Sequence, residues 1–203
     1  MLAETKQRIL DATAALFQRY GYTGTGLKQV VANANAPFGS VYHFFPGGKA
    51  QLGEEVIRRS GQMYLELVLG VFVAADDTIQ GVRDIFTGAA EVLRATDYVD
   101  ACPVATIALE VASSCEPLRQ ATAEVFETWI AAAAASFGGG VLDERTARHL
   151  AMVVIELLEG AFILSRAARS TEALEAAADA AAIVVGTALD AAHQRHPRRG
   201  PRT

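Results

Sequence analysis

Apolar residues recur at steps of three and four positions through long stretches of this 203-residue sequence. That spacing places them on one face of an α-helix. Alanine and leucine are abundant in these stretches, prolines are few and runs of β-branched residues are short, which favours helix over strand. The sequence therefore predicts an all-α fold. The first apolar face comprises Ile9, Ala12, Leu16, Phe17 and Tyr20.

Several classes of protein are disfavoured by the same sequence. The N-terminus alternates charged with apolar residues and lacks the uninterrupted apolar core of a signal peptide. The most apolar later stretch, residues 151–164, contains Glu156 and Glu159 and is too short to span a bilayer. Cys102 and Cys115 have neither metal-ligand spacing nor the pattern of a disulfide framework. We therefore expect a cytoplasmic protein without a membrane partner, a metal or another cofactor.

Residues 37–49, PFGSVYHFFPGGK, place an aromatic segment between two helix-boundary signals. Pro37 suits the first turn of a helix, and Pro46-Gly47-Gly48 ends that helix after a few turns. A helix this short has too little apolar surface to be a core element alone. We expect its Val41 and Phe45 to face inward, under the cover of another helix.

The segment before it predicts a second short helix, from Leu27 to about Ala34. Thr25 is a good N-cap for this helix. Asn35 fits the turn that follows, because asparagine tolerates the left-handed backbone conformation. The long first helix, which Gly21 ends, would cover both short helices. This is the helix-turn-helix arrangement, whose last helix enters the major groove of DNA.

The positions of the third helix that would be exposed carry groups suited to DNA. Serine, tyrosine and histidine can hydrogen-bond phosphate oxygens or base edges, glycine permits close approach of the backbone, and phenylalanine can contact a thymine methyl. Core tyrosines and ordinary surface histidines are the alternative, but they do not explain the whole unit. The predicted DNA-facing residues are Phe38, Gly39, Ser40, Tyr42 and His43, with Thr25, Lys28 and Lys49 contacting phosphates on either side.

The charge is divided unevenly along the chain. The net charge is −5, which by itself is unusual for a nucleic-acid-binding protein. Residues 1–50 nevertheless carry five basic and two acidic side chains, so the acidic excess lies in residues 51–203. A basic N-terminal unit on an acidic body agrees with DNA binding at that end, although chance scatter of surface charge would give the same division.

Residues 21–52, GYTGTGLKQVVANANAPFGSVYHFFPGGKAQL, resemble the DNA-binding region of the TetR family of transcriptional repressors. The segment Cys102-Pro103-Val104-Ala105-Thr106 and the Pro-Gly-Gly-Lys junction look like the LmrA/YxaF-type branch of that family. The features that match the DNA-binding region are Gly21, Tyr22, Thr25, Ala34, Gly39, Ser40, Tyr42, His43, Phe45, Pro46 and Lys49.

The sequence departs from the family pattern at two positions. Asn35 stands where the turn commonly has glycine, and it is compatible with a left-handed turn. Phe38 stands where the third helix often has lysine or arginine. Because of this second departure, the sequence determines neither the base contacts nor the operator sequence. It also does not determine whether Phe38 contacts a base.

The rest of the chain reads as a larger helical body. Pro117 opens one of its helices, and Phe137-Gly138-Gly139-Gly140 forms a loop. The other expected helices run from Lys49 through Phe72, from Asp76-Asp77 through Leu93, from Val104 to about Ala112, from Glu144 to about Ala168 and from Thr171 to about Ala192.

The resemblance implies that this body binds a small effector and forms a homodimer. The last two helices are the best dimer candidates, with an apolar stripe that includes Leu150, Val154 and Ala161. The alternative is that these helices only close the core of the monomer. Each aromatic residue of the middle helices is by itself more consistent with plain core. The predicted ligand-binding residues, for a small and largely apolar ligand, are Tyr64, Phe86, Tyr98, Phe126, Trp129, Met152 and Phe162.

The predicted organisation has three parts. Residues 1–48 form a helix-turn-helix DNA-binding domain, residues 49–192 a helical ligand-binding and dimerisation domain, and residues 193–203 a basic disordered tail. We expect a repressor that binds a palindromic operator in double-stranded DNA as a homodimer and is released by the effector. The alternative is a ligand-binding or scaffolding helical dimer without specific DNA binding. An enzyme is disfavoured, since no nucleophile–base pair, metal cluster or cofactor fingerprint has a usable spacing.

Overall fold

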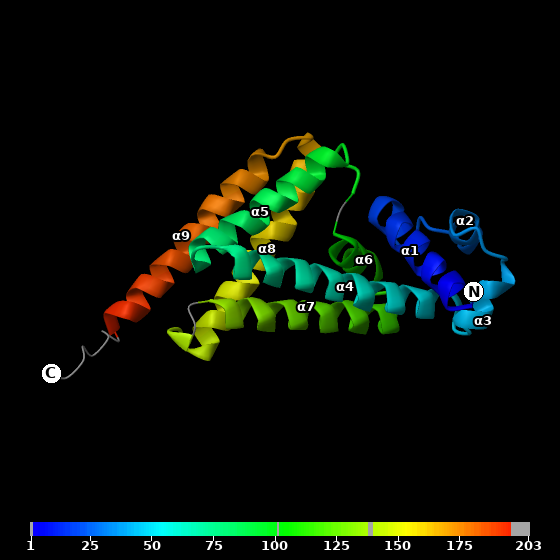
Figure 1. The fold of residues 1–203 in the computed structure, drawn as a ribbon, viewed down its shortest axis with the longest axis horizontal. Helices are drawn as coiled ribbons and strands as arrows, with labels where there is room; N and C mark the ends of the chain where they lie inside the picture. Colours follow the sequence, from blue (N-terminus) through cyan, green and yellow to red (C-terminus); the bar gives the residue numbers. More distant parts are fainter. Residues whose placement is uncertain (1, 101, 138–139, 196–203) are drawn as a thin grey trace. The chain divides into compact units, whose positions relative to one another are not determined.

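The computed structural model describes residues 2–100, 102–137 and 140–195, and their regular structure is helical throughout. This confirms the all-α prediction (Figure 1). The helices are α1 Leu2–Tyr20, α2 Leu27–Asn33, α3 Gly39–Phe44, α4 Gly48–Ala74, α5 Thr78–Ala95, α6 Pro103–Val111, α7 Glu116–Ser136, α8 Glu144–Ala168 and α9 Glu172–Arg195.

Polar caps explain where several of these helices begin. The Asp77 carboxylate accepts a hydrogen bond from the backbone N–H of Gln80 at the start of α5, and the Asp143 carboxylate accepts one from the N–H of Thr146 at the start of α8. Pro103 opens α6, where its missing N–H leaves no donor unsatisfied. These starts agree with the sequence within one or two residues.

Two details of the helix-turn-helix segment differ from the sequence prediction. The N-cap of α2 is Gly26, not Thr25, and no side chain caps this helix. Pro37 precedes α3, which begins at Gly39, instead of opening it. Both differences shift a boundary by one or two residues and leave the predicted elements in place.

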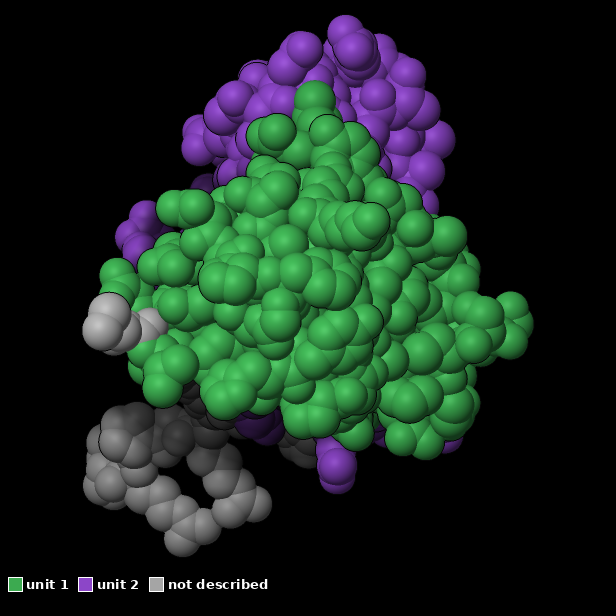
Figure 2. All heavy atoms as spheres, turned by 90° about the vertical axis from the view of Figure 1, so that its right-hand side faces the viewer, with its two compact units in different colours: residues 1–64, 99–127 green, residues 65–98, 128–203 purple. Residues whose placement is uncertain are grey.

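The described chain forms two compact units, which Figure 2 shows in different colours. Unit 1 comprises residues 1–64 and 99–127, and unit 2 comprises residues 65–98 and 128–203. Helices α4 and α7 contribute to both units. The functional division at residue 48 stays a prediction. In the predicted tail, His193 to Arg195 belong to α9, and residues 196–203 lie outside the described residues.

In unit 1, α1 packs against α2, α3 and α6. Its buried face agrees with the predicted one at Ile9, Leu16 and Phe17. Tyr20 was predicted on that face, but it is 55% exposed because it lies at the last residue of the helix. The additional buried residues on α1 are Leu10 and Thr13.

Helices α4 and α7 approach each other closely within unit 1 at two glycines of α4. A Cβ on Gly53 would lie 2.9 Å from a methyl of Leu118, and one on Gly61 would lie 2.5 Å from a methyl of Val125. Both distances are shorter than van der Waals contact, so a side chain at either position would force the helices apart. Gly61 lowers the helix propensity of α4, and its close packing against α7 explains why a glycine stands at this position.

Unit 2 is built around α5, α8 and α9, which pack against one another. Its core contains Phe86 and Leu93 from α5 and Ala181 and Val185 from α9. The apolar stripe of α8 that was predicted for a dimer contributes Leu150, Val154 and Ala161 to this core. Since these three residues are buried within the chain, they do not form a free surface, and pairing through the last two helices stays a prediction. None of the helices in the described ranges combines the length and apolar character that a membrane span requires.

Candidate nucleic-acid interface

The α2–turn–α3 segment is held by the apolar residues that the sequence placed inside. Val30 on α2 and Val41 at the centre of α3 are each exposed by 1% or less, as is Phe45 directly after α3. Asn35 lies in the turn between the two helices with a φ angle of 46°, the left-handed conformation expected from its identity. The predicted inward residues of the third helix are therefore confirmed.

The turn between α2 and α3 is also held by a charged side chain from α1. The Nε atom of Arg8 donates to the carbonyl oxygen of Ala34 at 3.0 Å, and a second guanidinium nitrogen donates to the carbonyl oxygen of Asn35 at 3.4 Å. Arg8 thus binds carbonyl groups at the end of α2, where helical partners are lacking. These hydrogen bonds connect α1 to the turn that precedes α3.

A second charged side chain, Glu110 of α6, holds the turn between α1 and α2. Its carboxylate accepts hydrogen bonds from the backbone N–H of Tyr22 at 3.2 Å and of Thr23 at 2.7 Å. Gly21 has a φ angle of +70°, and a Cβ there would lie 1.7 Å from a carboxylate oxygen of Glu110. Glycine at position 21 therefore serves both the left-handed backbone and the close approach of Glu110.

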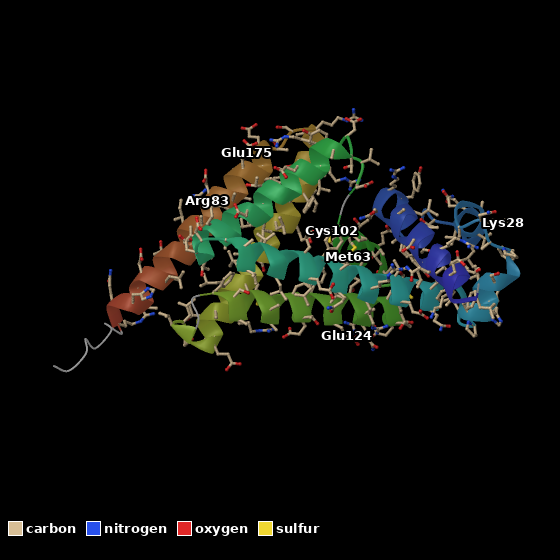
Figure 3. All side chains as sticks on the ribbon, in the orientation of Figure 1. Lys28, Met63, Arg83, Cys102, Glu124 and Glu175 are labelled. Atoms are coloured by element: carbon tan, nitrogen blue, oxygen red, sulfur yellow. The ribbon has the colours of Figure 1, made fainter. Side chains whose placement is uncertain are left out.

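The surface left open by this packing carries most of the predicted DNA-facing residues. Phe38 is 44% exposed and Tyr42 is 52% exposed. Gly39 and His43 are exposed, and Ser40 is half-buried. Lys28 is exposed on α2, where Figure 3 labels it. The α2–α3 segment therefore presents hydroxyl, imidazole, aromatic and ammonium groups to solvent.

Two predicted phosphate contacts are engaged within the protein instead. Thr25 is 1% exposed, and its hydroxyl donates to the carbonyl oxygen of Gly21 at 2.7 Å. The ammonium group of Lys49 lies 4.2 Å from the ring centroid of Tyr22, a cation–π geometry. Burial lowers the pKa of Lys49, and the Glu110 carboxylate opposes that shift. The Thr25 side chain is thus structural, whereas Lys49 must leave the ring to reach a phosphate.

Sequence reasoning missed the two residues that hold the turns, Arg8 and Glu110, as parts of this site. Glu110 lies more than 80 positions from the backbone groups that it binds, so no local spacing reveals it. A signal for Arg8 exists only once α1 is known to pack on α2, because its partners lie 26 and 27 positions away. Gly21 was noticed as a helix stop, and the structure adds its contact with Glu110.

The predicted ligand-binding residues are divided between the two units. Tyr64, whose hydroxyl accepts a hydrogen bond from Gln18 at 2.9 Å, and Phe126 lie in unit 1. Phe86 lies in the core of unit 2, and Tyr98 and Phe162 pack against that core. Trp129 is half-buried and Met152 is 37% exposed, both also in unit 2.

One surface depression in unit 2 has a volume of about 360 Å³, and none of the predicted ligand-binding residues lines it. Phe72 borders it and makes an edge-to-face contact with Phe137, with ring centroids 6.1 Å apart. The other lining residues are Leu69, Val73, Ala75, Asp77, Thr78 and Ser136. The structure of each unit therefore does not gather the predicted ligand-binding set around one cavity.

Unit 2 exposes large apolar side chains on its last two helices. On α8, Ile163 is 57% and Leu164 is 62% exposed, and on α9, Ile183 is 65% exposed. These residues lie outside the core stripe of α8 described above. Helix α8 therefore carries apolar residues both on the face that enters the core of unit 2 and on an exposed face.

Comparison with protein families gives two matches along the chain. The model described as bacterial regulatory proteins, tetR family, matches residues 9–56, which include α2 and α3. The model described as transcriptional regulator LmrA/YxaF-like, C-terminal domain, matches residues 78–180. Together they cover the helix-turn-helix segment and most of unit 2.

Individual proteins agree with these matches. The HTH-type transcriptional regulator LmrA of Bacillus subtilis (strain 168) is 30% identical over 171 residues, which cover 84% of this chain and 91% of LmrA. YxaF of the same organism, an uncharacterized HTH-type transcriptional regulator, is 32% identical over 162 residues, covering 80% of this chain and 85% of YxaF.

Solved structures show the same fold. Regulatory protein TetR from Rhodobacter sphaeroides has a TM-score of 0.78 and 21% identity, with 88% of this chain and 97% of that chain covered. A TetR transcriptional regulator from Legionella pneumophila also has a TM-score of 0.78, with 20% identity and coverage of 90% and 96%.

Proposed function

Because the chain belongs to the TetR family of bacterial regulatory proteins, in its LmrA/YxaF-like branch, we propose that it represses transcription from a palindromic operator and is released by a small effector. Membership makes the chain a DNA-binding transcriptional regulator and not an enzyme. The observation that carries the finer proposal is the surface of α3 formed by the exposed Tyr42 and His43 and the half-buried Ser40, with the turns on either side of α2 held by Arg8 and Glu110. The regulator would act in the cytoplasm, where its operator lies.

The proposed contacts with DNA follow from the chemistry of that surface. Tyr42 and His43 each offer groups that can hydrogen-bond a base edge or a phosphate oxygen in the major groove. Ser40 can do the same, and Lys28 contributes a phosphate contact from α2. Lys49 contributes a second phosphate contact if DNA draws its ammonium group off the ring of Tyr22. The role of Thr25 is to hold the turn before α2, through its hydrogen bond to Gly21.

A homodimer is proposed from the exposed apolar faces of α8 and α9. One helix-turn-helix unit makes too few contacts for tight specific binding, whereas two units about 34–36 Å apart can reach successive major grooves. Pairing of Ile163, Leu164 and Ile183 with the same residues of a second copy would bury side chains that are otherwise more than half exposed. Two helices from each copy would then form a four-helix interface.

The effector is proposed to be small and largely apolar, bound by the helical body through some of Tyr64, Phe86, Tyr98, Phe126, Trp129, Met152 and Phe162. For the effector to release DNA, it needs only to bind two conformations of the protein with different affinities. A coupling free energy of about 1–3 kcal/mol changes DNA affinity about 5- to 150-fold. By linkage, operator DNA would weaken effector binding by the same factor.

The proposal is tested by selection of duplexes from a random library with the full-length protein. A palindrome should be enriched, and the logarithm of its affinity should fall linearly with the logarithm of salt concentration. Small molecules can then be screened for release of that duplex. Recovery of no preferred sequence would favour the alternative, a ligand-binding or scaffolding dimer without specific DNA binding, to which the absence of lysine and arginine from α3 also points.

A further inference from the structure

Helix α3 presents an aromatic pair to solvent where charge would be expected on a DNA-reading helix. Its sequence, GSVYHF, contains no lysine or arginine. Phe38, the residue directly before it, is 44% exposed, and Tyr42 is 52% exposed. Apolar rings of this size are usually covered by other parts of the protein. Their exposure at the centre of the proposed reading surface therefore needs a partner.

The two rings are held in a defined arrangement. Phe38 and Tyr42 meet edge to face, with ring centroids 5.9 Å apart and an interplanar angle of 64°, a favourable geometry for aromatic pairs. Behind Tyr42 lies Gly48, whose added Cβ would stand 3.7 Å from a ring carbon of the tyrosine. The Tyr42 ring therefore lies close to the first residue of α4.

The space beside the pair is open. A Cβ on Gly39 would meet no atom within 4 Å. Glycine at this position is therefore not required by packing inside the protein, and its φ angle lies outside the left-handed range. An open position next to an exposed ring leaves room for another molecule to approach the backbone of α3.

The chemistry of phenylalanine restricts what it can recognise in DNA. Its side chain cannot hydrogen-bond, so it distinguishes bases only through apolar contact. The apolar group that base pairs display in the major groove is the C5-methyl of thymine. We propose that Phe38, supported by Tyr42, reads a C5-methyl group in each half-site of the operator. This inference rests on the proposed function, and it makes Phe38 a specificity-determining residue.

A C5-methyl group has two sources in duplex DNA, thymine and 5-methylcytosine. The selected palindrome provides the test for both. Each thymine of one half-site is replaced in turn by deoxyuridine, which lacks only the methyl group. At the thymine next to Phe38 the affinity should fall about fourfold, the value of one buried carbon group. That T·A pair is then replaced by C·G and by 5-methyl-C·G. These two duplexes present the same hydrogen-bonding groups, so the difference between their affinities is the effect of the methyl group alone.

Variants connect the methyl effect to the aromatic pair. Phe38→Ala should bind the thymine and deoxyuridine duplexes equally, and 5-methylation should no longer raise its affinity. Tyr42→Phe retains the supporting ring and should retain the discrimination. Met63→Ala, which removes another exposed apolar side chain of unit 1 (Figure 3), is the matched control and should discriminate as the unaltered protein does.

The outcomes separate this inference from the proposed function. A preferred palindrome that tolerates deoxyuridine at every thymine would overturn the role of Phe38 and leave the repressor proposal intact. Equal discrimination by Phe38→Ala and the unaltered protein would overturn it as well. Failure to select any sequence contradicts the proposed function itself, and the exposed pair would then be assigned to a protein partner.

Discussion

The carboxylate of Glu110 on α6 accepts a hydrogen bond of 2.7 Å from the backbone N–H of Thr23, in the turn that leads into α2. The same carboxylate accepts a second bond from the N–H of Tyr22. A residue from the second segment of unit 1, residues 99–127, therefore fixes the start of the helix-turn-helix segment. The stability of that segment depends on a charged group almost 90 positions away in the chain.

Removal of the Glu110 carboxylate should destabilise the protein. Glu110→Ala removes two hydrogen bonds to a charged group, one from the half-buried N–H of Tyr22 and one from the exposed N–H of Thr23, at a cost of about 1–3 kcal/mol in the free energy of unfolding. Glu110→Gln retains one acceptor and should cost less. Chemical denaturation measures both values. Glu124→Ala is the control, since this glutamate pairs with Arg58 at the surface of the same unit and should change stability by at most about 1 kcal/mol. Equal effects of the two alanine substitutions would contradict the anchoring role of Glu110.

Substitution of Gly21 should be coupled to Glu110. Gly21→Ala places a left-handed alanine at a cost of about 1–2 kcal/mol and drives its Cβ against the carboxylate. The double substitution Gly21→Ala/Glu110→Ala should therefore cost less than the sum of the single ones, because the clash is lost with the glutamate. Thermal or chemical unfolding of the four proteins gives the coupling. Strict additivity would show that the two residues do not touch in solution.

Substitution of Gly39 should separate stability from DNA affinity. The space around this residue is open, so Gly39→Ala should leave the free energy of unfolding unchanged or slightly higher. The new methyl group should nevertheless lower affinity for the selected operator, because it stands where α3 would approach DNA. Gly88→Ala, at an equally open position on α5, is the matched control and should raise stability without changing DNA affinity. An unchanged affinity for Gly39→Ala would show that DNA does not approach this position.

A charged residue on the exposed face of α9 should separate the proposed dimer. Ile183→Glu places a carboxylate at a position that is 65% exposed in the single chain, so the fold of each copy should persist. Pairing should be lost, because the dimer would bury this charge. Sedimentation velocity should report a monomer, with an unchanged helical circular dichroism spectrum. Val92→Glu, at a half-exposed position of α5, should remain dimeric. A dimer that survives Ile183→Glu would place the interface elsewhere.

The cap of α8 gives a prediction about acid stability. Hydrogen bonds from the backbone and side chain of Thr146 lower the pKa of Asp143 below its ordinary value of 3.8. Because the folded-state pKa is lower, the stabilisation by Asp143 is present above pH 3.8 and is lost as the pH falls toward the folded-state value. Asp143→Asn retains a capping oxygen without the charge. Its stability should change less between pH 4 and pH 2 than that of the unaltered protein, as measured by thermal unfolding.

Local patterns in the sequence predicted most of the fold. The spacing of apolar residues located the long helices, and Asp77, Pro103 and Asn35 marked boundaries because each acts on the few residues beside it. Tyr20 was wrongly predicted to be buried, because periodicity does not reveal at which residue α1 ceases to be packed against other helices. Periodicity alone could not decide whether Leu150 faces the core or a partner, because α8 is apolar on two faces.

The candidate site was predictable to a smaller extent. The exposed Tyr42 and His43 follow from the inward positions of Val41 and Phe45, since a helix with a known buried face has a known outer face. The partners of Lys49 and the anchoring role of Glu110 depend on helices that are distant in sequence. No spacing rule links such residues, so these contacts required the structure.

The most direct measurement compares the unaltered protein with His43→Ala on the selected palindrome and on a scrambled duplex, by fluorescence anisotropy at one stated salt concentration. The account predicts that His43→Ala lowers affinity for the palindrome about 5- to 150-fold, equivalent to about 1–3 kcal/mol. Affinity for the scrambled duplex, oligomeric state and thermal unfolding should not change. Full retention of specific affinity in both His43→Ala and Tyr42→Ala would contradict the claim that the exposed face of α3 reads DNA.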